Sequence, residues 1–492
     1  MFRKPYYYTK TMKVPKSKTI LISLLVLSAF IHLWNPVGFP EIFYDEGIYM
    51  HRAMNVLNGI GPQEGKFYDH PFFGQIFLGS ILYGIGYPDS VSYDKDSTQN
   101  LYSAPRILMG LFAIFDTFLI YKIAQKRYST KIALFATLLF AVMPITWITR
   151  RILLDSILLP FTLLSILFVL YSKDSTHKSW LVLFSGVFVG LAIFTKIPAF
   201  TILPVLTYLV YSTHKNKKLV VLLIAPAVLL PMIWPAYAIT HDQFEYWKKD
   251  VLWQAQRENT GIHNTALSFG AIDPVLFGLG IAGLIYSGIK KNWFLLMWTV
   301  PFTVFLSVIG YTQYFHWMIL LPAFCIAASF MIADIGKTIR QRQIVPICVI
   351  LLVTSFGFAS HFALLNLDVS KNQFEALSFA FDLAQKKNTI VLAGPQLLWI
   401  YDDVIGSNTF QDYSRVLFKQ APDKFVLVAD PHFHLDSYRG QELSQIYNST
   451  VTTAVFPNAK SNYDVYAYPY SSLGYNYDAG LIEVKITGNL SN

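Results

Sequence analysis

The chain has 492 residues, of which 54% are hydrophobic and only 14% are charged, with a formal net charge of +9. Soluble domains carry about 25% charged residues, so this composition excludes an ordinary soluble protein and indicates a polytopic membrane protein. Its two cysteines, Cys325 and Cys348, both lie in apolar segments, which excludes a disulfide framework and a cysteine-based metal site.

The first 18 residues contain six basic and no acidic residues, and the apolar run 19–34 follows them. A signal peptide shares this plan, but no clear small-residue cleavage site follows, so we interpret the run as an uncleaved first span with a cytosolic N-terminus. Further apolar segments lie at 71–88, 104–121, 132–149, 156–172, 180–195, 197–212, 219–238, 273–289, 292–310, 314–335 and 344–364.

The basic residues decide which of these segments cross the membrane. Twenty of the 39 Lys and Arg residues lie in six clusters that contain a single acid, Asp174. Basic loops stay on the cytosolic side, and all six clusters do so only if 71–88 lies along the interface instead of spanning. We therefore predict about eleven spans, with 71–88 as a juxtamembrane segment. The clusters are residues 1–18, 122–131, 173–178, 215–218, 290–291 and 337–342.

This topology predicts a polytopic α-helical transmembrane domain, residues 1–365, in the cell membrane or the membrane of the endoplasmic reticulum. Its large external loops are 39–103, with juxtamembrane helices, and 239–272. The tail, residues 366–492, changes in character and is predicted to form a small external α/β domain, on the lumenal side if the membrane is that of the endoplasmic reticulum. In it we expect a helix at 371–387 and strands at 389–393, 425–429, 451–456 and 465–468.

Two adjacent carboxylates, Asp45 and Glu46, follow the first span directly. A carboxylate at the boundary between water and membrane can accept a proton from a hydroxyl group, which makes both residues candidates for catalysis. Acids in the first turn also favour a helix N-terminus, so a purely structural role is the alternative.

Several cations are predicted on the same external side as these carboxylates. Cations that converge on one leaflet suit an anionic group such as a lipid phosphate, whereas any single one could simply extend to the interface. The candidates for phosphate binding are Arg106, Arg151, Lys196, Arg257 and His316. Asp69, His70 and Asp155 are candidates for acceptor binding or structural support.

Metal binding has weaker support in the sequence. Asp69, His70 and His263 could supply oxygen and imidazole ligands for a divalent metal, but no pair has tight ligand spacing such as His-x-x-x-His. No Gly-rich nucleotide-binding loop is present outside the apolar segments. We therefore expect no nucleotide-sugar donor and no certain cofactor.

With these residues laid out, the chain resembles the GT-C superfamily of polytopic glycosyltransferases, in its protein O-mannosyltransferase and aminoarabinose-transferase-like branch. Four motifs carry the resemblance over residues 19–365: Tyr44-Asp45-Glu46-Gly47-x-Tyr49, Tyr68-Asp69-His70-Pro71, Arg151-Ile152-Leu153-Leu154-Asp155-Ser156 and Phe194-Thr195-Lys196. The sequence departs from the branch at Phe72, where a second proline is usual, and at Gln75, where a basic residue is common.

The resemblance implies an enzyme that transfers a hexosyl or pentosyl group from a polyprenyl or dolichyl phosphate. The acceptor would be a hydroxyl of a protein, lipid or glycan on the non-cytosolic face, with membrane lipids as further partners and no nucleic acid. It further implies Asp45 as general base and inversion at the anomeric carbon. Two alternatives stay open on the residues alone: a transporter or flippase of a lipid-linked saccharide, and a non-catalytic membrane scaffold.

Overall fold

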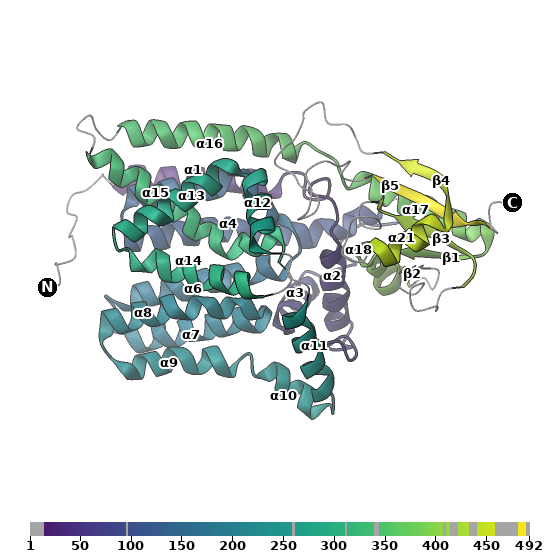
Figure 1. Ribbon diagram of the computed structural model, residues 1–492, viewed down its shortest axis with the longest axis horizontal. Coiled ribbons are helices and arrows are strands. Elements are labelled where there is room, and N and C mark those ends of the chain that lie inside the picture. The colour runs from purple at the N-terminus through teal and green to yellow at the C-terminus, as the bar shows by residue number, and fades with distance from the viewer. Residues whose placement is uncertain are drawn as a thin grey trace.

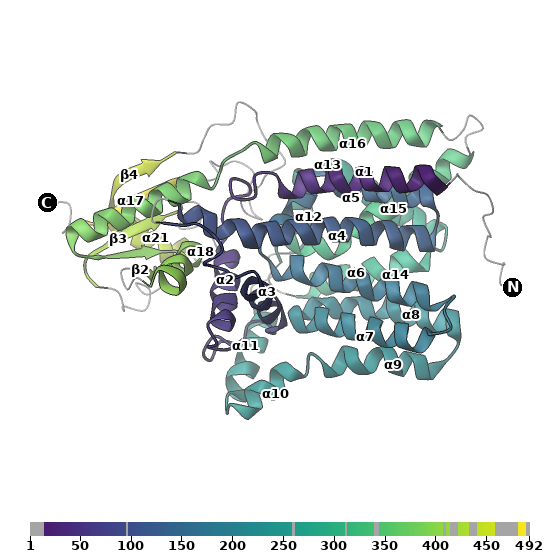
Figure 2. The ribbon, with the colours of Figure 1, turned by 180° about the vertical axis from the view of Figure 1, so that it is seen from behind.

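The computed structural model of the chain describes residues 14–94, 97–257, 261–309, 312–338, 344–406, 410–413, 422–431, 440–457 and 481–488. Long apolar helices run side by side through most of its length, and the C-terminal unit lies beyond one end of this bundle (Figure 1). Figure 2 shows the same arrangement from behind.

Twelve helices lie in the apolar segments predicted as spans, because the segment 219–238 contains two of them. The helices are α1 (Val14–Leu33), α4 (Ser103–Arg127), α5 (Thr130–Val142), α6 (Leu154–Ser172), α7 (Lys178–Thr195), α8 (Leu203–His214), α9 (Lys217–Leu229), α10 (Ile233–Thr240), α13 (Pro274–Ile289), α14 (Trp293–Val308), α15 (Leu321–Thr338) and α16 (Ile344–Leu365). Among the described residues, six continuous helices are long and apolar enough to cross a bilayer, and the count reaches eight if each of two bent helix pairs is one span.

Short 3-10 turns interrupt the bundle at the end where the C-terminal unit lies. The segment predicted as one span at 132–149 is α5 followed by η2 (Pro144–Arg150), with a bend of 70° between them. Three further 3-10 turns precede α4, α8 and α15: η1 (Thr98–Tyr102), η3 (Ile197–Ile202) and η4 (Tyr314–Leu320). A 3-10 turn leaves the regular helical repeat, so these breaks redirect the chain where polar residues enter the bundle.

The predicted juxtamembrane segment forms α3 (Phe73–Gly84), a helix of 12 residues. At 1.5 Å per residue such a helix is about 18 Å long, which is too short for a hydrocarbon core of about 30 Å. It packs against α2 (Tyr44–Leu57), which lies across the end of the bundle (Figure 1). The segment 239–272, predicted to be an external loop, contributes α11 (Phe244–Gln256) and α12 (Ile262–Ile272) to the same end (Figure 1).

The tail forms a five-stranded sheet in the order β2-β1-β3-β5-β4. β1 runs parallel to β2 and β3, whereas β5 is antiparallel to β3 and β4. The predicted helix is α17 (Lys371–Lys387), and the segment predicted as a strand at 465–468 lies outside the described residues. The strands are β1 (Ile390–Ala393), β2 (Phe410–Asp412), β3 (Phe425–Ala429), β4 (Thr450–Phe456) and β5 (Ile482–Thr487), and the remaining helices are α18 (Pro395–Trp399), η5 (Ile400–Ile405) and α21 (Gly440–Asn448).

The C-terminal unit packs directly on α2 and on the segment that precedes it. The side chain of Gln373 accepts the Ile42 N–H at 2.8 Å and donates to the Ile42 carbonyl at 3.0 Å. A Cβ atom on Gly47 would lie 2.2 Å from the Pro395 carbonyl oxygen, so only glycine allows this approach of α2 to α18. The position of α2 therefore depends on the tail as well as on the bundle.

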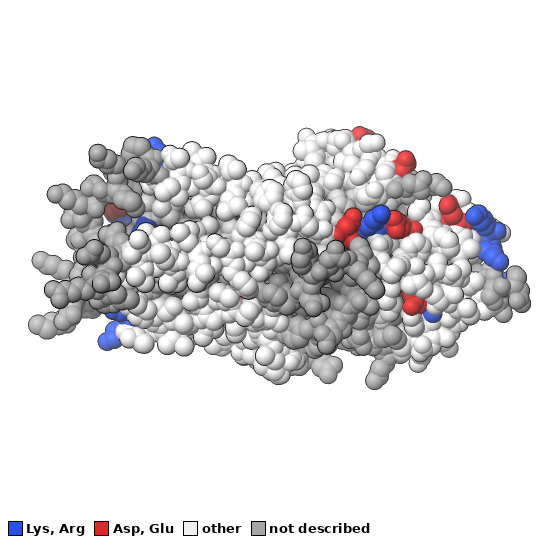
Figure 3. All heavy atoms as spheres, turned by 90° about the horizontal axis from the view of Figure 1, so that it is seen from above, with Lys and Arg blue, Asp and Glu red and all other residues white. Residues whose placement is uncertain are grey.

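Charged side chains avoid the middle of the molecule. On the face seen in Figure 3, Lys, Arg, Asp and Glu gather at the two ends, and the broad region between them is almost free of them. Large apolar side chains such as Val221, Leu352 and Val308 are strongly exposed on the bundle helices. A belt of this kind suits lipid better than water, in agreement with a membrane-spanning bundle.

Candidate active site

The two candidate carboxylates lie in the first turn of α2, where successive side chains point about 100° apart around the helix axis. Glu46 folds back and accepts the Phe43 N–H at 2.9 Å, which caps the helix start. Glu46 is fully buried, whereas Asp45 keeps partial exposure to solvent. The two neighbours therefore occupy different environments.

Glu46 is held by a dense set of donors. Arg106 donates from Nε at 3.0 Å and from Nη2 at 2.7 Å, and the Ile152 N–H donates at 3.0 Å. Arg151 lies 3.4 Å away. Burial alone would raise the pKa of Glu46, but the charges of Arg106 and Arg151 hold it below its usual value. Glu46 is thus ionised, and both of its carboxylate oxygens accept hydrogen bonds from the protein.

Most of the remaining donors of these two arginines also have acceptors in the protein, although Nε of Arg151 has none among the described residues. Arg106 donates to the carbonyls of Pro40 at 2.6 Å and Glu41 at 3.0 Å. Arg151 donates to the Glu41 carboxylate at 2.5 Å and to the Glu41 carbonyl at 2.8 Å. Both side chains are at most 1% exposed. The phosphate-binding role predicted for them does not match these contacts, because their donors already fix the segment before α2.

Asp45 differs from Glu46 in its hydrogen bonds and in the direction of its pKa shift. Within the described parts of the chain its carboxylate makes no hydrogen bond and no ion pair, and burial raises its pKa to about 6. Lys196 and Arg257 act on it as cations, and Asp69 and Asp155 as anions. A carboxylate with a pKa near the operating pH and no partner is suited to accept a proton.

Lys196 and Asp155 form an ion pair at 2.6 Å, and both are largely buried. Lys196 is the last residue before η3, and Asp155 lies in the first turn of α6. The Lys196 ammonium also lies 5.2 Å from the centroid of the Phe315 ring. The end of α7 and the start of α6 therefore bring these charges to the same end of the bundle as α2.

His316 lies in η4, beside Phe315. Its Nδ1 accepts the Gln313 N–H at 2.9 Å, so the proton of the imidazole is on Nε2, which can donate. Lys196, His70 and Arg257 all act electrostatically on this ring. Arg257 follows α11, and its guanidinium lies 5.0 Å from the centroid of the Trp253 ring. Lys196 and Arg257 thus act electrostatically on both Asp45 and His316.

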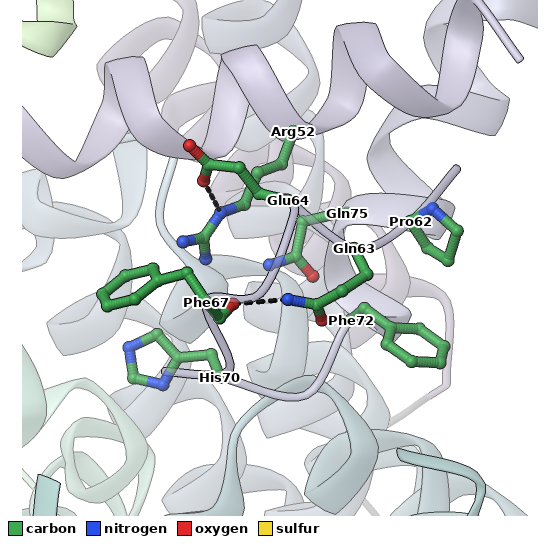
Figure 4. Close-up of a pocket in the computed structure, with 8 residues that line it drawn as sticks. All are labelled: Arg52, Pro62, Gln63, Glu64, Phe67, His70, Phe72 and Gln75. Atoms are coloured by element: carbon green, nitrogen blue, oxygen red, sulfur yellow. Dashed lines mark hydrogen bonds and ion pairs between the residues drawn. The ribbon is translucent and has the colours of Figure 1, made fainter. Parts of the chain in front are cut away.

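Asp69 and His70 belong to the same neighbourhood. Asp69 is paired with Arg52 at 2.9 Å, and Arg52 also binds Glu64 at 2.9 Å. Burial lowers the pKa of His70 to about 4, so its imidazole is neutral at pH 7. Figure 4 shows Arg52, Glu64 and His70 around a small depression that Gln63 and the phenyl ring of Phe72 also line.

Sequence reasoning missed Arg52 and Glu41. The signal for Arg52 was present, because Asp45, Tyr49 and Arg52 are spaced i, i+4 and i+7 and share one face of α2. No comparable signal existed for Glu41, whose partner Arg151 is 110 residues away in sequence.

The metal site suggested by the sequence has no matching cluster in the structure. In the part of the chain that the structure describes, no three His, Cys, Asp or Glu side chains are grouped so that they could hold a metal ion. Asp69 faces Arg52, and His263 is an exposed residue of α12. These donors do not fit a common ion, and none of the steps considered below involves a metal.

Fold and site together place a carboxylate and several cations at one end of an apolar helical bundle. Residues 22–241 match the family model of dolichyl-phosphate-mannose-protein mannosyltransferases. This match covers less than half of the chain. No protein of curated function matches it.

Solved structures share its fold at low sequence identity. The oligosaccharyltransferase of Archaeoglobus fulgidus in the apo form has a TM-score of 0.58 and 11% identity, covering 92% of this chain and 75% of its own. The same archaeal enzyme, AglB, in complex with an inhibitory peptide and a dolichol-phosphate has a TM-score of 0.53 and 11% identity, covering 87% and 71%. ArnT of Cupriavidus metallidurans bound to undecaprenyl phosphate has a TM-score of 0.56 and 11% identity, covering 98% and 100%.

Proposed function

We propose that this enzyme transfers a sugar from a polyprenyl or dolichyl phosphate to a hydroxyl group, with Asp45 as general base. The observation that carries the proposal is the contrast between two adjacent acids: Glu46 is saturated by arginines, whereas Asp45 is unpartnered among the described residues and has a raised pKa. AglB with dolichol-phosphate and ArnT with undecaprenyl phosphate, which share the fold, support a lipid-phosphate donor.

The difference between the unpartnered Asp45 and the paired Glu46 leads to the following transfer reaction. The acceptor hydroxyl gives its proton to the Asp45 carboxylate as its oxygen forms a bond to the anomeric carbon. The bond from that carbon to the phosphate oxygen breaks, and the lipid phosphate leaves with the electron pair. A single displacement of this kind inverts the anomeric centre. The leaving group is already an anion, so it needs fixed positive charge and hydrogen-bond donors and no protonating acid.

Lys196, His316 and Arg257 are proposed to supply these donors. Lys196 is held by Asp155, whose carboxylate fixes the ammonium without removing its other two N–H groups. His316 offers Nε2–H, because its Nδ1 is occupied by the Gln313 N–H. Arg106 and Arg151 are proposed to act one step away, by holding Glu46 and thereby the start of α2.

We further propose that the site faces the non-cytosolic side of an eleven-span bundle whose C-terminal α/β unit is external. The support is that α3 is too short to span and packs on α2, so the parity of the basic clusters is kept. Which membrane holds the protein follows from the donor lipid, which the assay below identifies.

The test is transfer of radiolabelled sugar from synthetic polyprenyl phosphate donors to an acceptor by the purified, detergent-solubilised protein. The wild type should form product and Asp45→Asn should not. Asp242→Asn is the matched control, because Asp242 is exposed and external to the bundle. Product formation by Asp45→Asn at the wild-type rate would refute the role of Asp45. Flipping of the donor in vesicles without any transfer would favour the transporter, and neither activity would favour a scaffold.

A further inference from the structure

A second group of cationic and imidazole side chains lies outside the site described above. Arg150, the last residue of η2, is 1% exposed, and His32 of α1 and His361 of α16 are fully buried. The two imidazole rings meet edge to face with their centroids 6.2 Å apart. These three side chains, the α1–α16 cluster, lie where the two helices run side by side (Figure 2).

The protein supplies acceptors for only some of the hydrogen-bond donors of Arg150. Its Nη2 donates to the carbonyls of Trp34 and of Asn35, the latter at 2.9 Å, just past the C-terminal end of α1. In the described part of the chain its Nε and Nη1 have no acceptor, although both are buried. No carboxylate is paired with it there, and the charge that acts on it most strongly is that of Arg106, another cation.

His32 adds an unused group at the same place. Within the described residues its Nε2 is buried without a hydrogen-bond partner, whereas the His361 ring faces the backbone of Val142 and Met143. An arginine stays ionised at any physiological pH, and buried charges and donors are destabilising unless they are paired. Two donors of a guanidinium beside the His32 imidazole therefore form a site that an anion would complete.

The surface in front of the cluster is apolar and aromatic. Phe30 of α1 and Phe362 of α16 stack with centroids 6.2 Å apart, directly beside the histidine pair, and Phe30 also contacts Trp34. Half of Trp34 is exposed, and Phe362 is also exposed. Aromatic residues of this kind favour the level of the lipid headgroups, and exposed apolar side chains such as Leu352 and Val26 continue along both helices.

We propose that the seam between α1 and α16 binds the phosphate of a membrane lipid, with Arg150 and His32 as its donors. The lipid chains would lie along the exposed apolar faces of the two helices. This site is distinct from the proposed donor site, because Arg150 points to the carbonyls at the end of α1, whereas Lys196 of the donor site is paired with Asp155. The proposal does not depend on the transfer reaction.

The test is native mass spectrometry of the full-length protein in detergent, titrated with phosphatidylglycerol. The wild type should retain one lipid molecule at low concentration, and Arg150→Gln should weaken this first binding step by tenfold or more, because charge-assisted hydrogen bonds are the strong ones. Lys248→Gln removes an exposed cation on α11 and should change binding less than twofold.

His32→Phe provides a second variant that keeps the contacts of Arg150 with the carbonyls of Trp34 and Asn35. It should also weaken the first binding step, and the increase in Tm that phosphatidylglycerol gives the wild type should be lost in both variants. Wild-type affinity in both variants would overturn the proposal, as would a wild type whose Tm does not respond to the lipid. Inorganic phosphate that displaces the lipid at equal concentration would overturn the assignment to a lipid.

Discussion

Replacing Asp45 by Asn should make the protein more stable and at the same time inactive. Burial raises the pKa of Asp45 from 3.8 to about 6. Between these values the native state binds more protons at this site than the unfolded state does, so the native state loses stability as the pH rises from about 4 to about 6. Above that range the ionised carboxylate destabilises the native state by up to about 3 kcal/mol.

Asn removes this destabilisation because it carries no charge. The increase in Tm of Asp45→Asn over the wild type should therefore be absent near pH 4, grow through the window between the two pKa values, and remain constant at higher pH. Activity should move in the opposite direction, because loss of a general base lowers the rate by about 10²- to 10⁴-fold. A stabilised but inactive variant is the signature of a strained catalytic group.

The pH profile of the wild type checks the same argument independently. With a pKa of about 6 for Asp45, the ionised fraction falls about tenfold between pH 7 and pH 5, and kcat/KM should fall with it. The assays are thermal unfolding of the purified protein and transfer from a radiolabelled lipid-phosphate sugar, with Asp242→Asn as the control for both. A destabilised Asp45→Asn at pH 7.5, or a wild-type profile that is flat from pH 5 to 7, would refute the reasoning.

Three further changes test the surroundings of Asp45. Glu46→Gln leaves Arg106 and its neighbours with an uncompensated buried charge, and should lower the free energy of unfolding by about 3–5 kcal/mol, which a loss of Tm and of folded yield would report. Gly47→Ala would push its Cβ into the backbone of α18 and should reduce activity. Gly84→Ala is the control, because its Cβ meets nothing within 4 Å, and it should leave activity unchanged in the same assay. Equal effects of the two changes would contradict the inference that the C-terminal unit positions α2. Lys196→Met should lower kcat/KM for the donor by about 10²- to 10³-fold, and unchanged kinetics would remove Lys196 from the phosphate site.

Much of the architecture was readable from the chain alone. The apolar runs and the basic clusters between them predicted where helices lie, because a helix in lipid must be about 20 apolar residues long and basic loops stay on one side. Charge parity predicted that 71–88 lies along the interface, and the structure has a 12-residue helix there, which is too short to span a bilayer. The bend between α5 and η2 was not predicted, because hydropathy does not register a break of the helical repeat.

The carboxylate pair and the cations were also visible in the sequence, but the different environments of Asp45 and Glu46 were not. Asp45 and Glu46 are neighbours with the same chemistry, and only long-range contacts separate them. Glu46 meets Arg106 and Arg151, 60 and 105 residues away in sequence, whereas Asp45 meets no donor among the described residues.

The chain by itself thus determined that a helical membrane bundle would carry acids and cations at one end. The folded molecule decided that Glu46 meets arginines, whereas Asp45 has no hydrogen-bond partner among the described residues. The physical reason is that hydropathy and charge act segment by segment along the chain, whereas the state of a buried ionisable group depends on partners that only folding brings within about 3 Å.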